Sequence, residues 1–146
     1  MEIKNILKGK VVIVGIGNIM KGDDGFGPLL VEKLKDKTPF VCIDGQTAPE
    51  NYTGKIAKEN PDTILLVDAV HMDLNPGVYK ILKKDEIANS GLTTHNMSPA
   101  MLIEFLENST GAEIYLLGMQ PKSINFGDEM SSEAKEALNN IAEEIK

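Results

Sequence analysis

Apolar runs along the chain have the length and composition of buried β-strands. The first, VVIVGIG at 11–17, is rich in β-branched residues and ends in glycines. Three further runs of the same kind occupy 40–44, 63–70 and 112–119. Continuous apolar runs of this length are typical of strands covered on both faces, as in a parallel sheet. A shorter run at 78–82 follows the turn signal Asn75-Pro-Gly and predicts a fifth, less buried strand.

Three amphipathic segments between and after these runs predict helices. The first begins near Pro28, the second is N-capped by Ser98 with Pro99 in its first turn, and the third begins at Ser132. The positions expected to face the core are Leu29, Leu30 and Leu34, then Met101, Leu102, Phe105 and Leu106, then Ala134, Ala137, Leu138 and Ile141. The segments 45–54 and 85–97 carry no periodic pattern and are expected to be irregular.

The alternation of strands and helices predicts an α/β fold. We expect a single three-layer domain over residues 1–146, with a mostly parallel, twisted sheet of about five strands and helices on both faces. No stretch of the sequence has the composition of a linker. A length of 146 residues also suits one domain with one good core.

Composition narrows the range of partners. The formal net charge of −7 does not favour binding to nucleic acid, because such proteins must neutralise phosphates. The single cysteine, Cys42, excludes an intrachain disulfide, and we expect it to be a small buried residue. The first ten residues fit neither a signal peptide nor a membrane span. We therefore expect a cytoplasmic, monomeric protein that does not bind membranes.

Candidate chemistry follows from where polar residues leave the predicted sheet. In open parallel sheets, ligands bind at the carboxyl ends of the strands. Asp23 and Asp24 follow the first strand, Asp68 ends the third, and His95 lies in the loop before the Ser98 helix. Asp24, Asp68 and His95 from three such segments could form a three-ligand site with open positions. Mixed oxygen and nitrogen ligands of this kind suit zinc or nickel.

The glycine-rich stretch after the first strand permits other interpretations. Gly15 and Gly17 fit a dinucleotide fingerprint, but Met20 stands where its third glycine belongs, and the two aspartates would repel a pyrophosphate. Asp23 and Asp24 could instead cap the following helix. Asp68 could be a hydrogen-bonded structural residue, and a lone histidine in a loop is often simply exposed. We judge Asp24 the stronger site candidate and Asp23 the stronger cap, and we take His71 to be exposed.

Four segments together resemble the hydrogenase maturation endopeptidases, which trim the C-terminus of the large subunit of [NiFe] hydrogenases. They are GIGNIMKGDDGFGP, GQTAPENYTG, TILLVDAV and THNMSP, and they occur in the family's order. The APEN segment is similar to the subgroup that processes large subunits of the hydrogenase 3 type. The roles of Glu50 and Asn51 within that segment stay open.

The resemblance implies a substrate and a site. The expected partner is the large-subunit precursor, cut shortly after its last nickel-binding cysteine. Asp24, Asp68 and His95 match the family's metal-binding set, and the metal that matters is the nickel already inserted in the substrate. Zinc or cadmium could occupy the same ligands. An aspartic mechanism would pair Asp24 with Asp68, and activation of water by a carboxylate or by the metal stays open.

Two other functions remain compatible with the residues alone. One is a metal-sensing binding protein or chaperone that has the site but does not cut, and the other is a small nucleotide-binding module.

The glycines of the first loop are expected to serve backbone shape or close approach of the precursor. On that view, Gly17→Val should weaken activity more than stability.

Overall fold

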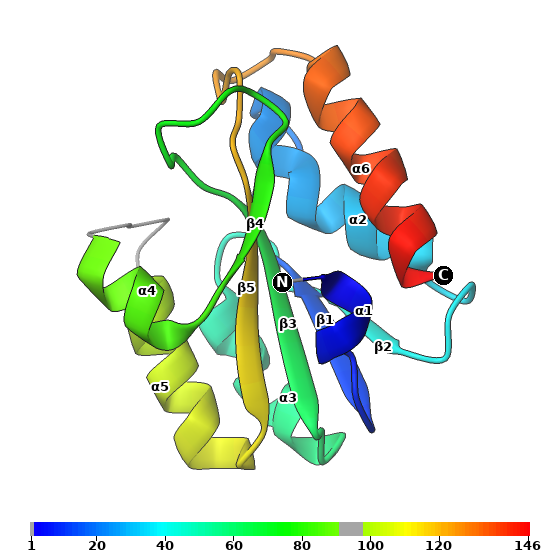
Figure 1. The fold of residues 1–146 in the computed structure, drawn as a ribbon, viewed down its shortest axis with the longest axis vertical. Coiled ribbons are helices and arrows are strands. Elements are labelled where there is room, and N and C mark those ends of the chain that lie inside the picture. The colour runs from blue at the N-terminus through cyan, green and yellow to red at the C-terminus, as the bar shows by residue number, and fades with distance from the viewer. Residues whose placement is uncertain (1, 91–97) are drawn as a thin grey trace.

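Strands and helices alternate along the chain and assemble into one sheet with helices on both faces (Figure 1). The computed structural model describes residues 2–90 and 98–146. The strands are β1 (Val11–Gly15), β2 (Val41–Asp44), β3 (Thr63–Ala69), β4 (Tyr79–Leu82) and β5 (Glu113–Met119). The helices are α1 (Ile3–Ile6), α2 (Phe26–Leu34), α3 (Thr53–Lys58), α4 (Lys84–Ser90), α5 (Pro99–Thr110) and α6 (Ser132–Ile145), with 3-10 turns η1 (Gly22–Gly25) and η2 (Pro49–Tyr52).

The sheet has the strand order β2-β1-β3-β5-β4. All neighbours pair in parallel except β4, which runs antiparallel to β5. The predicted α/β class with a mostly parallel five-stranded sheet is therefore confirmed. The central strands β1 and β3 are buried along their whole length, as continuous apolar runs require. The edge strand β4 is only partly buried, in agreement with its mixed sequence.

The two faces of the sheet bury separate apolar clusters. Ile13, Leu65 and Leu117 pack under α1, α2 and α6, whereas their sequence neighbours face the opposite side, under α3, α4 and α5. This division follows from the strand period of two residues, which sends successive side chains to opposite faces. The three helices of each layer are grouped on either side of the sheet in Figure 1.

All three predicted helices are present as α2, α5 and α6, and caps mark several of their ends. Ser98 accepts a hydrogen bond from the Met101 N–H at 3.2 Å, so its predicted N-cap role is confirmed. Gly111 ends the same helix in the left-handed conformation. At the start of α6, Ser131 rather than Ser132 is the cap, and its hydroxyl accepts from the Ala134 N–H.

Some expectations about local structure were wrong. The 45–54 segment contains η2 and the start of α3, and the 85–97 segment begins within α4. These helices are too short to show a periodic pattern in the sequence. On α5, Leu102 and Leu106 are buried as expected, but Met101 and Phe105 are 61% and 51% exposed, because Ile103 takes the third core position. On α2, Leu30 and Leu34 are buried, whereas Leu29 is exposed.

The order of connections creates a switch point in the sheet. The chain leaves β1, crosses one face through α2 to β2, and returns over the other face through α3 to β3. From β3 the chain runs to β4 and then to α4 and α5, which cover the face opposite α2. The chain thus moves to opposite faces after β1 and after β3, and in such folds ligands bind in the crevice at this point. Within residues 2–90 and 98–146, no helix is long and apolar enough to cross a membrane.

Candidate functional site

The loop after β1 is tied to both neighbouring strands at the switch point. The Ile16 N–H donates to the carbonyl of Val67 on β3 at 2.8 Å. The Gly17 N–H donates to the carbonyl of Gln46, just past β2, also at 2.8 Å. The loop then turns back over itself through η1 and enters α2. This route holds the η1 turn against the end of β3.

Gly17 allows this fold-back for a backbone reason. Its φ of +145° lies in a region that L side chains rarely adopt, and a Cβ there would overlap the carbonyl oxygen of Asp24. The expected conformational role of this glycine is therefore confirmed. The close approach is to the chain's own backbone, however, and Gly15 likewise faces the backbone of Gly27. Substitution at Gly17 should consequently cost stability, contrary to the sequence-based expectation.

The same loop does not offer a cradle for phosphate. A phosphate loop needs several backbone N–H groups directed at the ligand. Here five of these N–H groups already donate hydrogen bonds within the chain, to acceptors in β3, in the loop after β2 and in the loop after β1 itself. The donors are Ile16, Gly17, Asn18, Met20 and Lys21. This arrangement disfavours the nucleotide-binding interpretation.

Asp24 and Asp68 lie in segments that meet at the switch point. Asp24, 8% exposed, is in η1, and its Oδ2 accepts a hydrogen bond from the Asn18 N–H at 2.9 Å. Asp68, 1% exposed, is the penultimate residue of β3, opposite Gly118 of β5. Both carboxylates are thus largely withdrawn from water. Such burial favours a carboxylate only where donors or a cation compensate its charge.

The position of Asp68 within β3 also defines the face it belongs to. Along the strand it alternates with Leu66 and Val70, which pack in the cluster beneath α3, α4 and α5. Its neighbours Val67 and Ala69 pack on the opposite side. His95, the third predicted residue, lies outside the described residues.

Asp23 has a structural role and is not part of this crevice. Its carboxylate accepts three hydrogen bonds at 2.7 to 2.8 Å, from the Lys122 N–H, the Ser131 N–H and the Ser131 hydroxyl. It caps neither η1 nor α2. The prediction that Asp23 caps the following helix was therefore wrong, because its carboxylate is used by partners in the loop after β5. The sequence gives no signal for this pairing, because the partners are about a hundred positions away.

Two other polar residues beyond strand ends also serve the fold. Gln120 is 7% exposed, and its Oε1 accepts from the Met72 N–H at 2.6 Å, which holds the loop after β3. His71 is exposed, as predicted, with its Nδ1 3.4 Å from the Gln120 side-chain nitrogen. Cys42 is only half-buried, because β2 is an edge strand, and burial raises the pKa of its thiol.

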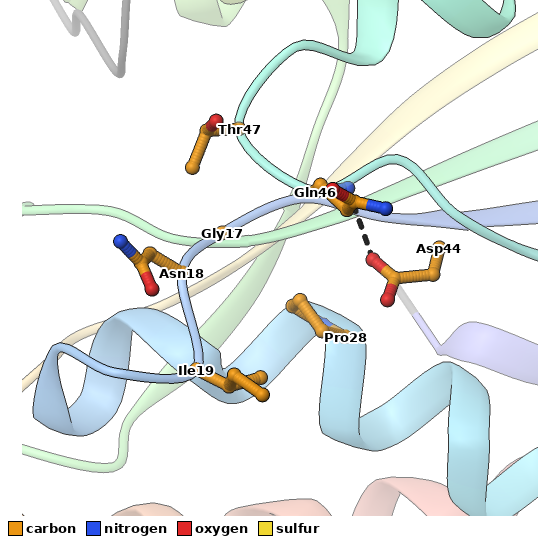
Figure 2. A pocket seen from close by; sticks show the side chains of 7 residues that line it. All are labelled: Gly17, Asn18, Ile19, Pro28, Asp44, Gln46 and Thr47. Carbon is orange, nitrogen blue, oxygen red and sulfur yellow. Dashed lines mark hydrogen bonds between the residues drawn. The ribbon is translucent and has the colours of Figure 1, made fainter.

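A pocket of about 380 Å³ adjoins the Asp24 loop (Figure 2). Its walls come from the loop after β1, the first turn of α2 and the loop after β2. They are Gly17, Asn18, Ile19, Pro28, Asp44, Gln46 and Thr47. Figure 2 shows the Gln46 backbone bound to the Asp44 carboxylate, a hydrogen bond of 2.9 Å. Because the Asn18 N–H binds the Asp24 carboxylate, the Asn18 wall of this pocket adjoins Asp24.

The described residues hold no complete metal site by themselves. In residues 2–90 and 98–146, no three His, Cys, Asp or Glu side chains gather as metal ligands. Asp24 and Asp68 can supply two carboxylate ligands, so any three-ligand set around them needs a group from elsewhere, such as His95 or a partner.

Comparison with known proteins identifies the family. The model of the HycI hydrogenase maturation protease family matches residues 28–146. The chain belongs to this family. A hydrogenase 3 maturation protease of Escherichia coli is 41% identical over 138 residues, which cover 92% of this chain and 88% of that protein.

Solved structures agree with this assignment. The [NiFe] hydrogenase maturation protease HycI of Thermococcus kodakarensis aligns with a TM-score of 0.86 at 36% identity, covering 96% of this chain and 93% of that one. The endopeptidase HycI of Escherichia coli aligns with a TM-score of 0.84 at 38% identity, covering 94% and 89%. The predicted family and fold are confirmed, and the chain is a hydrolase of the endopeptidase class that acts in hydrogenase maturation.

Proposed function

We propose that this protein removes the C-terminal peptide from the nickel-loaded large-subunit precursor of a [NiFe] hydrogenase, of the type served by hydrogenase 3 maturation proteases. The observation that carries the proposal is the meeting of the Asp24 turn with the Asp68 strand at the switch point. In a chain of this family, the contact between η1 and β3 brings together two segments that each carry a buried aspartate, and a pocket adjoins the loop after β1.

Asp24, Asp68 and His95 are the proposed recognition and catalytic residues. Carboxylate oxygens and an imidazole nitrogen are suitable ligands for a nickel ion that has open positions. Support for Asp68 comes from its face of β3, which packs against α5. Support for His95 comes from the sequence, because it precedes the Ser98 cap of α5 by three residues. Zinc or cadmium, supplied in solution, would use the same groups.

The two carboxylates would gain from the nickel of the precursor. Both belong to the buried residues, and carboxylate oxygens are ligands for a divalent cation. The nickel-loaded precursor can therefore gain metal–ligand bonds that the metal-free precursor cannot, so the loaded form should bind better. A ligand shifts an outcome only through such a difference in affinity. Cleavage would therefore follow nickel insertion and make it irreversible.

Hydrolysis also requires an activated water. A carboxylate at Asp24 or Asp68 can take the proton as a general base. The alternative is activation by the nickel of the substrate, which lowers the pKa of a bound water. The chain's single cysteine lies within the edge strand β2, and its thiol has a raised pKa, which argues against a thiol nucleophile.

The test compares nickel-loaded and metal-free precursor under chelator control. The proposal predicts a precursor shortened at its C-terminus, by mass spectrometry, only for the loaded form. Efficient cleavage of metal-free precursor would show that the three residues are a conventional catalytic centre. Tight binding of loaded precursor with no change in its mass would favour the alternative of a metal-sensing chaperone. Precursor from which the C-terminal peptide has already been deleted is the matched control.

A further inference from the structure

An exposed apolar surface borders the candidate site. Phe126, Ile19 and Met20 are among the most exposed large apolar side chains of the described residues, at 70%, 64% and 56%. We call these three residues the apolar rim. Apolar side chains this exposed cost free energy in water, and grouped ones often mark an interaction surface.

Two loops form the rim, and hydrogen bonds hold them together. The Gly127 N–H donates to the Met20 carbonyl at 2.8 Å, which places Phe126 next to the Met20 loop. The Gly22 N–H donates to the Asp128 carbonyl at 3.2 Å. Asp23 adds its hydrogen bonds to Ser131. The rim is therefore a preformed surface, and a partner would lose little entropy in ordering it.

The rim is continuous with the site. Ile19 also lines the pocket beside Asp24, and it follows Asn18, whose N–H binds the Asp24 carboxylate. The rim therefore reaches the wall of the pocket. Because its side chains are mostly exposed to solvent, it suits a protein surface better than a small molecule, which pockets enclose.

We infer that the apolar rim is a docking surface for the hydrogenase precursor, which it contacts through apolar side chains near the segment to be cut. This inference rests on the proposed function, because it takes its partner from there. Methionine and phenylalanine are enriched in protein interfaces, where a few large side chains supply most of the affinity. The rim provides affinity for the precursor, and the carboxylates provide the response to nickel.

The test uses the variant M20S/F126S, which leaves the pocket residue Ile19 in place. The replaced side chains are exposed, so the fold should be retained. The matched control is M101S/F105S, which removes two comparably exposed apolar side chains from α5. Steady-state cleavage of nickel-loaded precursor should show a KM raised by about tenfold or more for the rim variant, with kcat within about twofold. The α5 variant should keep both constants.

Several outcomes would overturn the inference. An unchanged KM in the rim variant would do so, as would a lower kcat with an unchanged KM, or an equal effect of the α5 variant.

If sedimentation shows that the natural chain self-associates through the rim, the surface belongs to a second copy. If the natural chain binds the precursor without cutting it, the proposed function fails. The affinities of the natural and rim-variant chains for the precursor then test the rim by themselves.

Discussion

The carboxylate of Asp23 binds Ser131 through two hydrogen bonds, although the residues are 108 positions apart. One oxygen accepts from the Ser131 N–H at 2.7 Å and the other from its hydroxyl at 2.8 Å. The same hydroxyl caps α6 by accepting from the Ala134 N–H. A single buried carboxylate thus joins the loop after β1 to the start of the last helix. Its neighbour Asp24 is thereby held at the switch point.

Replacing Asp23 should lower the free energy of unfolding. D23A removes a buried acceptor of three hydrogen bonds and leaves the donors without it, so we expect a loss of about 3 kcal/mol. D23N keeps one acceptor oxygen and should lose less. Urea denaturation measures both. The control is E129A, at an exposed position in the loop after β5 that holds the partners of Asp23. It should change the free energy of unfolding by less than about 0.5 kcal/mol. A D23A loss as small as the control's would contradict this structural role.

D24N should abolish processing and leave the fold nearly intact. The amide keeps an oxygen that can accept from the Asn18 N–H, but it removes the charge. We expect cleavage of nickel-loaded precursor to fall by at least about 100-fold, the lower range for loss of an acid–base group. The melting temperature should change little. E129Q, also a neutralised carboxylate, is the control and should cleave normally.

His95→Ala should also abolish processing. Its imidazole is the proposed third ligand for the nickel of the precursor, so removing it should weaken recognition of the loaded form. A gel-shift assay of precursor processing measures the effect, and H71A, at the only other histidine, is the matched control. Normal processing by H95A would show that the histidine has been misassigned.

Gly17→Val should destabilise the protein. A side chain there would overlap the Asp24 carbonyl, and a φ of +145° is strained for valine. We expect a loss of about 3 kcal/mol or more, as for other clashes with backbone in a packed site. The control is G54A in α3, where a Cβ meets nothing within 4 Å. G54A should gain about 0.5 to 1 kcal/mol, because alanine favours a helix. A melting temperature unchanged in G17V would contradict the packing role.

Cys42 should react as a thiol with a raised pKa and should not be needed for activity. Burial raises its pKa, so the rate of alkylation should reach half its maximum at a higher pH in the folded protein than in the denatured one. The pH dependence of iodoacetamide labelling, followed by intact mass, measures this. C42A should process the precursor at the natural rate. A loss of cleavage in C42A would reopen a cysteine mechanism.

The sequence by itself determined the class of fold. Buried strands such as VVIVG and TILLVDA are continuous apolar runs, and their burial on both faces follows from that pattern. Ser98 and Pro99 marked the start of α5 because capping is a local interaction. The motifs also identified the family and selected Asp24 and Asp68. Strand-end position was enough to propose these two residues, since the topology of parallel sheets fixes where loops gather, and their role stays a prediction.

Other features depended on tertiary structure. The role of Asp23 required knowledge that Ser131 and Lys122 fold next to it, and no local pattern encodes such distant partners. Phe105 looked like a core residue at helical spacing, yet only the placement of α5 on the sheet decides which side of its stripe is covered. The close fit of Gly17 against Asp24 is likewise set by the turn as a whole. These contacts depend on how separate segments pack against one another in the folded chain. The pattern of apolar and polar residues indicates only which secondary structure a segment prefers and which of its positions are apolar.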